Sequence, residues 1–149
     1  MRLTRFSDIS LRALMYLGAH EGRPVSTPEM SGRLRVSRDH LMKSLQALAG
    51  LGLVVGERGR GGGFRLVRAG ASIRLGGLVR SLERSHGLAE CFGEESTCPL
   101  TGGCRLAGVL REAESGFYGV LDGYTVADLL AANRLDLVQL GESRAVAHH

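Results

Sequence analysis

Apolar residues recur at spacings of three and four along the first third of the chain, which is the periodicity of amphipathic helices. The pattern predicts helices over residues 7–19, 27–34 and 38–49. Ser7, Ser26 and Ser37 stand where N-terminal caps are needed. The second and third helices are short and are separated by only a few residues, an arrangement typical of a helix-turn-helix.

The pattern then changes to two short apolar runs, residues 53–57 and 64–67, each of strand length. Between them lies the segment Arg58-Gly59-Arg60-Gly61-Gly62-Gly63. Two strands around a glycine-rich tip predict a β-hairpin, and a hairpin directly after a helix-turn-helix is the wing of a winged-helix domain.

Helical periodicity returns over residues 75–84, 104–121 and 126–131. The long second helix carries an apolar stripe that is too broad for packing within one small domain, and we expect it to join two copies of the chain. The stripe comprises Leu106, Val109, Leu110, Ala113, Phe117, Val120 and Leu121. The expected fold is therefore mainly α with a small β-wing: a winged helix-turn-helix with a long C-terminal dimerisation helix.

We expect four regions: a DNA-binding domain (1–80), a ligand-binding loop (81–104), the dimerisation helix with a short last helix (104–134) and a tail (135–149). Charge divides at the first boundary. Residues 1–80 hold 14 of the 19 Lys and Arg residues but only 5 of the 15 Asp and Glu residues, and the remainder is acidic. This asymmetry indicates that the first region alone meets a polyanion.

The polar side of the third helix carries Ser37, Arg38, His40 and Lys43, and the hairpin tip carries Arg58 and Arg60. Such side chains can read base edges in the major groove or enter the minor groove. Alternatively, they form a solvated helix face and a soluble hairpin. The basic charge of residues 1–80 favours double-stranded DNA.

Other functions lack their motifs. No Gly-Lys-Ser/Thr follows the glycines, so a nucleotide site is not expected. The sequence shows neither an acid–base pair nor a nucleophile elbow, so an enzyme is not expected. The sequence contains no run of 18 apolar residues, so a membrane-spanning helix is not expected.

The three cysteines of the chain, Cys91, Cys98 and Cys104, lie within one short stretch. Their spacings are wider than the CxxC pairs of zinc ribbons and suit a larger object, such as an iron–sulfur cluster held by three thiolates. A structural zinc site and redox-active thiols are the alternatives. Asp8, His86 and Glu90 are candidate fourth ligands. An odd number of cysteines is a poor disulfide framework and fits a reducing cytoplasm.

Together these segments resemble a family of small dimeric winged-helix regulators that bear a three-cysteine cluster and include IscR and RirA. The resemblance covers about residues 1–140 and is strongest to the nitric-oxide-sensing branch. The matching segments are 1–4 with Asp8 and Leu11-Arg12, 37–43 (SRDHLMK), 58–64 (RGRGGGF), Leu82-Glu83, Glu90-Cys91, 98–100 (CPL), 104–106 (CRL) and 121–129 (LDGYTVADL).

The resemblance implies a homodimeric, cytoplasmic repressor that binds a palindromic operator and releases it when nitric oxide attacks the cluster. It implies that Cys91, Cys98 and Cys104 hold the cluster and that Asp8 is a possible fourth ligand. We expect a 4Fe–4S rather than a 2Fe–2S cluster. A regulator that responds to iron or cluster supply is the alternative within the family, and a zinc-stapled DNA-binding protein without sensing is the alternative outside it.

Overall fold

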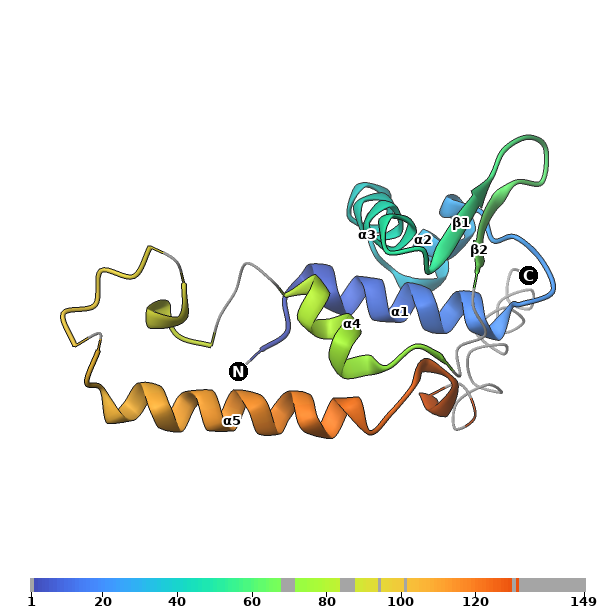
Figure 1. Ribbon diagram of the computed structural model, residues 1–149. Coiled ribbons are helices and arrows are strands. Elements are labelled where there is room, and N and C mark those ends of the chain that lie inside the picture. Colours follow the sequence, from blue (N-terminus) through green and yellow to red (C-terminus); the bar gives the residue numbers. More distant parts are fainter. Residues whose placement is uncertain are drawn as a thin grey trace, which may run out of the picture.

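The computed structural model of the chain describes residues 2–67, 72–83, 88–93, 95–100, 102–129 and 131. Its elements in order are α1 (Arg5–Ala19), α2 (Thr27–Leu34), α3 (Arg38–Gly50), β1 (Val54–Glu57), β2 (Gly63–Leu66), α4 (Leu75–Leu82), the 3-10 turn η2 (Glu90–Phe92) and α5 (Arg105–Asp122) (Figure 1). Residues 126–129 are also helical. The predicted fold, mainly helical with one small hairpin, is confirmed.

The caps of α2 and α3 are the predicted serines. Ser26 Oγ accepts a hydrogen bond from the Glu29 amide, and Ser37 Oγ accepts one from the His40 amide. Each bond satisfies a backbone donor that the first helical turn leaves unpaired. In the turn between the helices, Arg35 adopts the left-handed conformation with φ of 53°.

The cap of α1 differs from the prediction. Thr4, not Ser7, precedes the helix, and its Oγ1 accepts the Ser7 amide at 3.2 Å. Ser7 is fully buried inside the first turn. Both residues offer a hydroxyl that could cap a helix. Thr4 takes the role because Glu83 also holds its amide and hydroxyl, each at 2.8 Å.

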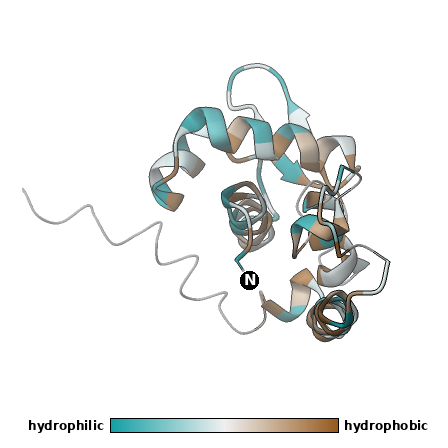
Figure 2. Cartoon of the chain, turned by 90° about the vertical axis from the view of Figure 1, so that its left-hand side faces the viewer, coloured by the Kyte–Doolittle hydropathy of each residue, from teal (hydrophilic) through white to brown (hydrophobic). Residues whose placement is uncertain are grey.

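One core forms around α1, which the other helices surround (Figure 2). Each of the first three helices turns its apolar positions inward, and α4 and the short helix after α5 add to the same cluster. Its fully or nearly fully buried members include Ile9, Leu14, Leu17, Val25, Met30, Leu41, Leu45, Leu48, Val54, Ile73, Leu75, Leu78 and Val126. Helices α1 and α3 therefore pack closely against each other in this core.

The wing is an antiparallel pair in which Val54 lies opposite Leu66 and Glu57 opposite Gly63. At Phe64, opposite Gly56, β2 is joined to the segment before α2 by two backbone hydrogen bonds with Val25, of 2.9 and 2.8 Å. At its tip Gly59 and Gly61 have φ of 101° and 79°, a region in which glycine carries no steric penalty.

Helix α5 packs against α4 with its second half, while its first half lies under the cysteine-containing loop (Figure 1). Arg80 of α4 pairs with Asp122 at 2.8 Å and stacks over the Tyr118 ring at 4.7 Å. Ala107 is the single buried residue of α5. Three residues of the predicted stripe, Leu106, Val109 and Val120, are 63%, 54% and 65% exposed.

Within the described part of the chain, no helix combines the length and the hydropathy needed to cross a membrane.

Candidate functional site

Helix α3 presents a polar face above a buried apolar one. Leu41, Leu45 and Leu48 lie in the core, whereas Ser37, Arg38, His40 and Lys43 are exposed. The Ser37 hydroxyl is also engaged locally, because it lies 2.5 Å from Nδ1 of His40 in addition to capping the helix. The guanidinium of Arg38 and the ammonium of Lys43 therefore offer the freest donors on this face.

The tip of the wing exposes Arg58 and Arg60. Just below it, Arg65 and Glu57 form an ion pair of 2.9 Å across the hairpin, which braces the two strands. The wing and α3 lie on the same side of α1 (Figure 1). One extended ligand could therefore contact the exposed residues of both elements.

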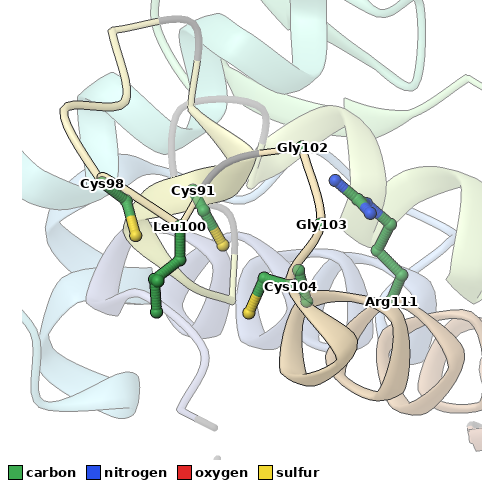
Figure 3. A pocket seen from close by; sticks show the side chains of 8 residues that line it. Cys91, Cys98, Leu100, Gly102, Gly103, Cys104 and Arg111 are labelled. Atoms are coloured by element: carbon green, nitrogen blue, oxygen red, sulfur yellow. The ribbon is translucent and has the colours of Figure 1, made fainter.

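The three cysteines are brought to one place. Cys91 lies in η2, Cys98 in the following loop, and Cys104 directly before α5. None of the three is in a disulfide, and each is partly buried. They line a cavity of about 200 Å³, into which their sulfur atoms turn around Leu100 (Figure 3).

Backbone bonds shape this loop. The amides of Phe92 and Gly93 donate to the carbonyls of Ala89 and Glu90 at 3.0 Å each, which closes the turn that carries Cys91. Gly102 has φ of 109° and lets the chain turn sharply into α5. Cys104 then stands at the N-terminus of an 18-residue helix, where the helix dipole stabilises negative charge.

Arg111 is a residue of this cavity that the sequence analysis missed. It follows Cys104 by two helical turns, so both project from one face of α5. Its guanidinium lies 5.1 Å from the ring centroid of Phe92, the neighbour of Cys91. Arg111 thus ties the turn that carries Cys91 to the helix that follows Cys104. A helical spacing of seven from Cys104 is the signal that could have identified it.

The donor chemistry of the cavity is that of an iron–sulfur site. The three thiols share one cavity, and thiolate sulfur is the ligand that iron–sulfur clusters take. Among the described residues, no group of three His, Cys, Asp or Glu side chains closes on one metal position.

Two of the three candidate fourth ligands can be placed. Asp8 lies in a different cavity, beside Arg5 and Thr4, and pairs with Arg12 at 2.6 Å. The chain does not bring Asp8 into its own cysteine cavity. Glu90 is exposed beside Cys91 and accepts a hydrogen bond from Thr97 at 3.1 Å. His86 lies outside the described residues.

Glu83 is a second residue to which the sequence analysis gave no role. Its side chain is buried, with the residue 8% exposed, at the end of α4. Its Oε1 accepts the amide and the hydroxyl of Thr4. Its charge also reaches α5, because the pKa of Tyr118 is raised first by burial and then by the charges of Glu114 and Glu83. No local sequence pattern indicates this contact, since its partners are 79 residues apart.

Comparisons with known proteins agree with this architecture. The family model Rrf2, described as an iron-dependent transcriptional regulator, matches residues 3–132. The chain is 43% identical over 134 residues to the HTH-type transcriptional repressor NsrR of Streptomyces coelicolor, with 89% of this chain and 90% of that protein covered.

Solved structures are similar in fold. IscR of T. potens matches with a TM-score of 0.71 at 24% identity, covering 100% of this chain and 94% of that one. CymR (YrzC), the global cysteine regulator of B. subtilis, matches with a TM-score of 0.69 at 22% identity, covering 89% and 98%. At these identities, the two structures support the fold alone.

Proposed function

We propose that this chain, which belongs to the Rrf2 family of transcriptional regulators expected from its motifs, is a homodimeric repressor. Its operator binding is controlled by an iron–sulfur cluster that reacts with nitric oxide. As a transcriptional regulator it is not an enzyme. The observation that carries the proposal is the cavity lined by Cys91, Cys98 and Cys104, next to a winged helix-turn-helix.

The DNA interface consists of α3 and the wing. Arg38, His40 and Lys43 enter the major groove with Ser37 at the start of the helix, and Arg58 and Arg60 contact the backbone or the minor groove. The exposure of these six residues supports this assignment. The excess of basic residues in 1–80 supports it as well.

Cys91, Cys98 and Cys104 hold the cluster as thiolates, and we favour a 4Fe–4S form. When bound, the cluster supplies iron that reacts with nitric oxide. We propose Asp8 as the remaining ligand; since it lies outside the cysteine cavity of its own chain, this role requires that it come from the second subunit of the proposed dimer. Its carboxylate is 44% exposed and is held by a surface pair with Arg12, which is a weak interaction that can be exchanged for another. Three cysteines outside any disulfide also suit a reducing cytoplasm.

Helix α5 forms the dimer through Leu106, Val109 and Val120, whose exposure is unusual for such large apolar side chains. Two winged helices joined in this way present two recognition helices to a palindromic operator. The organisation is thus a DNA-binding domain (1–80), a cluster loop (81–104), a dimerisation region (104–134) and a tail (135–149).

Control of DNA binding follows from where the loop lies in the chain. It connects the winged helix to the dimerisation helix, so its conformation sets the distance between the two recognition helices. A loop whose thiols are all engaged is constrained, and a loop with free thiols is not. A coupling of about 1–3 kcal/mol between the two states changes operator affinity roughly 5- to 150-fold.

Replacement of Cys98 tests the proposal. The DNA probe is a fragment selected from random sequences by the anaerobically purified protein. Cys98→Ala should abolish the iron and sulfide content together with tight binding, while Thr97→Ala, a change in the same loop without loss of a sulfur, should preserve both. Undiminished binding by Cys98→Ala contradicts the proposal. One zinc per chain without sulfide would identify a zinc-stapled DNA-binding protein instead.

A second candidate is a regulator that responds to iron or cluster supply. The description of the Rrf2 family as iron-dependent favours it. Such a protein would lose DNA on iron chelation and keep it when nitric oxide is added at a concentration equal to that of the cluster. A comparison of the two treatments distinguishes the candidates.

A further inference from the structure

We propose that Glu83 is a positioning residue that couples the cysteine loop to the recognition helix α3. The inference deepens the proposed function and rests on it, since the coupling requires that the loop controls DNA binding. It concerns a buried carboxylate at the junction of α1 and α4, outside the cysteine cavity and the DNA face.

The Glu83 carboxylate is buried and accepts hydrogen bonds from the start of the chain. One oxygen, Oε1, accepts both the amide and the hydroxyl of Thr4 at 2.8 Å. Burial of a carboxylate is costly unless donors compensate it, and hydrogen bonds to an ionised acceptor are about twice as strong as neutral ones. The Glu83–Thr4 contact therefore fixes the end of α4 against the start of α1.

Thr4 in turn organises the first turn of α1. Its Oγ1 accepts the Ser7 amide at 3.2 Å, and its carbonyl accepts the Asp8 amide at 3.0 Å. The hydroxyl has a single proton, and the Glu83 carboxylate at 2.8 Å is a stronger acceptor than the Ser7 hydroxyl at 3.0 Å. Glu83 thus orients the hydroxyl so that its lone pair faces the helix.

The first turn of α1 touches the recognition helix. The Phe6 carbonyl oxygen lies 3.5 Å from Oγ of Ser44, a fully buried residue of α3 that directly follows Lys43. Further along, Ile9 of α1 and Leu41 of α3 belong to the same close-packed core. Because such a core does not deform smoothly, a displaced α1 start shifts α3 with it.

On its other side, Glu83 belongs to the element that leads into the loop. It ends α4, eight residues before Cys91. Its charge also acts on Tyr118 of α5, the helix that begins after Cys104. Because α4 packs against α5, which begins directly after Cys104, a change in α5 acts on the Glu83–Thr4 contact, and through Thr4 and α1 on α3.

The test uses Glu83→Ala, Glu83→Gln and Thr4→Val in the full-length chain, with Glu112→Ala as the matched control on the exposed surface of α5. Glu83→Gln keeps an acceptor oxygen and serves if Glu83→Ala fails to fold. Two quantities are measured. The first is the ratio of operator affinities with and without the cluster, on a DNA fragment selected by the unsubstituted protein. The second is amide hydrogen exchange of residues 5–12 and 38–48 in the cluster-free protein.

Loss of a hydrogen bond to a charged group corresponds to a factor of about ten or more. We expect Glu83→Ala to lower the affinity ratio about tenfold and to speed exchange in both segments, with Thr4→Val not additive to it. Glu112→Ala should change neither quantity. A merely structural role would weaken both affinities equally and leave the ratio unchanged.

An unchanged ratio in Glu83→Ala, when the unsubstituted protein shows cluster-dependent binding, overturns the inference. Equal affinity of the unsubstituted protein with and without the cluster refutes the proposed function instead. In that case, hydrogen exchange alone decides whether Glu83 positions α3, and unchanged exchange in residues 38–48 rejects that role.

Discussion

The exposed stripe on α5 yields a quantitative prediction about dimerisation. Val109 and Leu106 lie on the first half of the helix, where they are 54% and 63% exposed. Val109→Asp places a charge in the middle of the proposed interface without touching the core of the winged helix. The substitution should therefore separate the two subunits while each remains folded.

Its magnitude follows from the exposed fraction. Full burial of a Val or Leu side chain stabilises by about 1.5–3 kcal/mol, so burial of the exposed half of Val109 contributes about 0.8–1.5 kcal/mol. Because a two-fold interface contains Val109 twice, the loss is about 1.6–3 kcal/mol per dimer. The dimer dissociation constant should rise about 15- to 150-fold, and more if the carboxylate is trapped without a partner.

Sedimentation equilibrium of the cluster-free, reduced protein measures this constant. Val67→Asp is the matched control, since Val67 is 53% exposed and lies at the base of the wing. Thermal unfolding followed by circular dichroism checks that the helices persist in both variants. The reasoning is refuted if Val109→Asp dimerises as tightly as the unsubstituted protein, or if Val67→Asp weakens the dimer equally.

Four further predictions concern DNA, the cysteine loop and pH. Arg60→Ala should weaken operator binding and reduce the dependence of log K on log salt by about 0.9 per lost phosphate contact; unchanged affinity in a salt titration rejects a wing contact. Arg38→Ala should relax base preference in competition binding, whereas equal weakening on all sequences would place Arg38 on phosphate. Arg111→Met removes the cation over Phe92 and should speed cluster loss to an iron chelator about two- to fivefold. Phe92→Leu should give the same acceleration, and combining the two substitutions should not increase it further. The pKa of Glu29 is lowered from 4.5, chiefly by its hydrogen bond from Arg23. Ionised Glu29 therefore stabilises the folded chain above pH 4.5, and this stabilisation is lost as pH falls through the lower folded pKa. Glu29→Gln should lower the free energy of unfolding by at most about 1 kcal/mol at pH 7 and by nothing once Glu29 is protonated in both states; a constant difference from pH 7 to 3 contradicts this assignment.

Local sequence predicted the parts of the fold that depend on neighbours in the chain. Ser26 and Ser37 cap α2 and α3 as expected because a cap bonds an amide three residues away. Ser7 was wrong as the cap of α1, since the choice between it and Thr4 is made by Glu83, 79 residues from Thr4. The spacing of residues along a helix does not reveal a contact between residues so far apart in the chain.

In the cysteine site, too, local sequence predicted some features and tertiary packing decided the others. The cysteines were found by residue type and spacing, and the structure brings all three to one cavity. Sequence could not say that Asp8 would lie apart from that cavity, because the distance depends on how α1 packs against α4. The contact of Arg111 with Phe92 was within reach, since a spacing of seven from Cys104 places Arg111 on the same helical face.

The central claim is that one group bound by Cys91, Cys98 and Cys104 controls DNA binding. The most direct measurement is a nitric oxide titration of the anaerobically purified protein bound to its selected DNA fragment, with visible absorbance and fluorescence anisotropy of the DNA followed together. We expect a brown protein that loses cluster absorbance and DNA over the same range of nitric oxide. A colourless protein, or DNA that stays bound after the absorbance has gone, would contradict it.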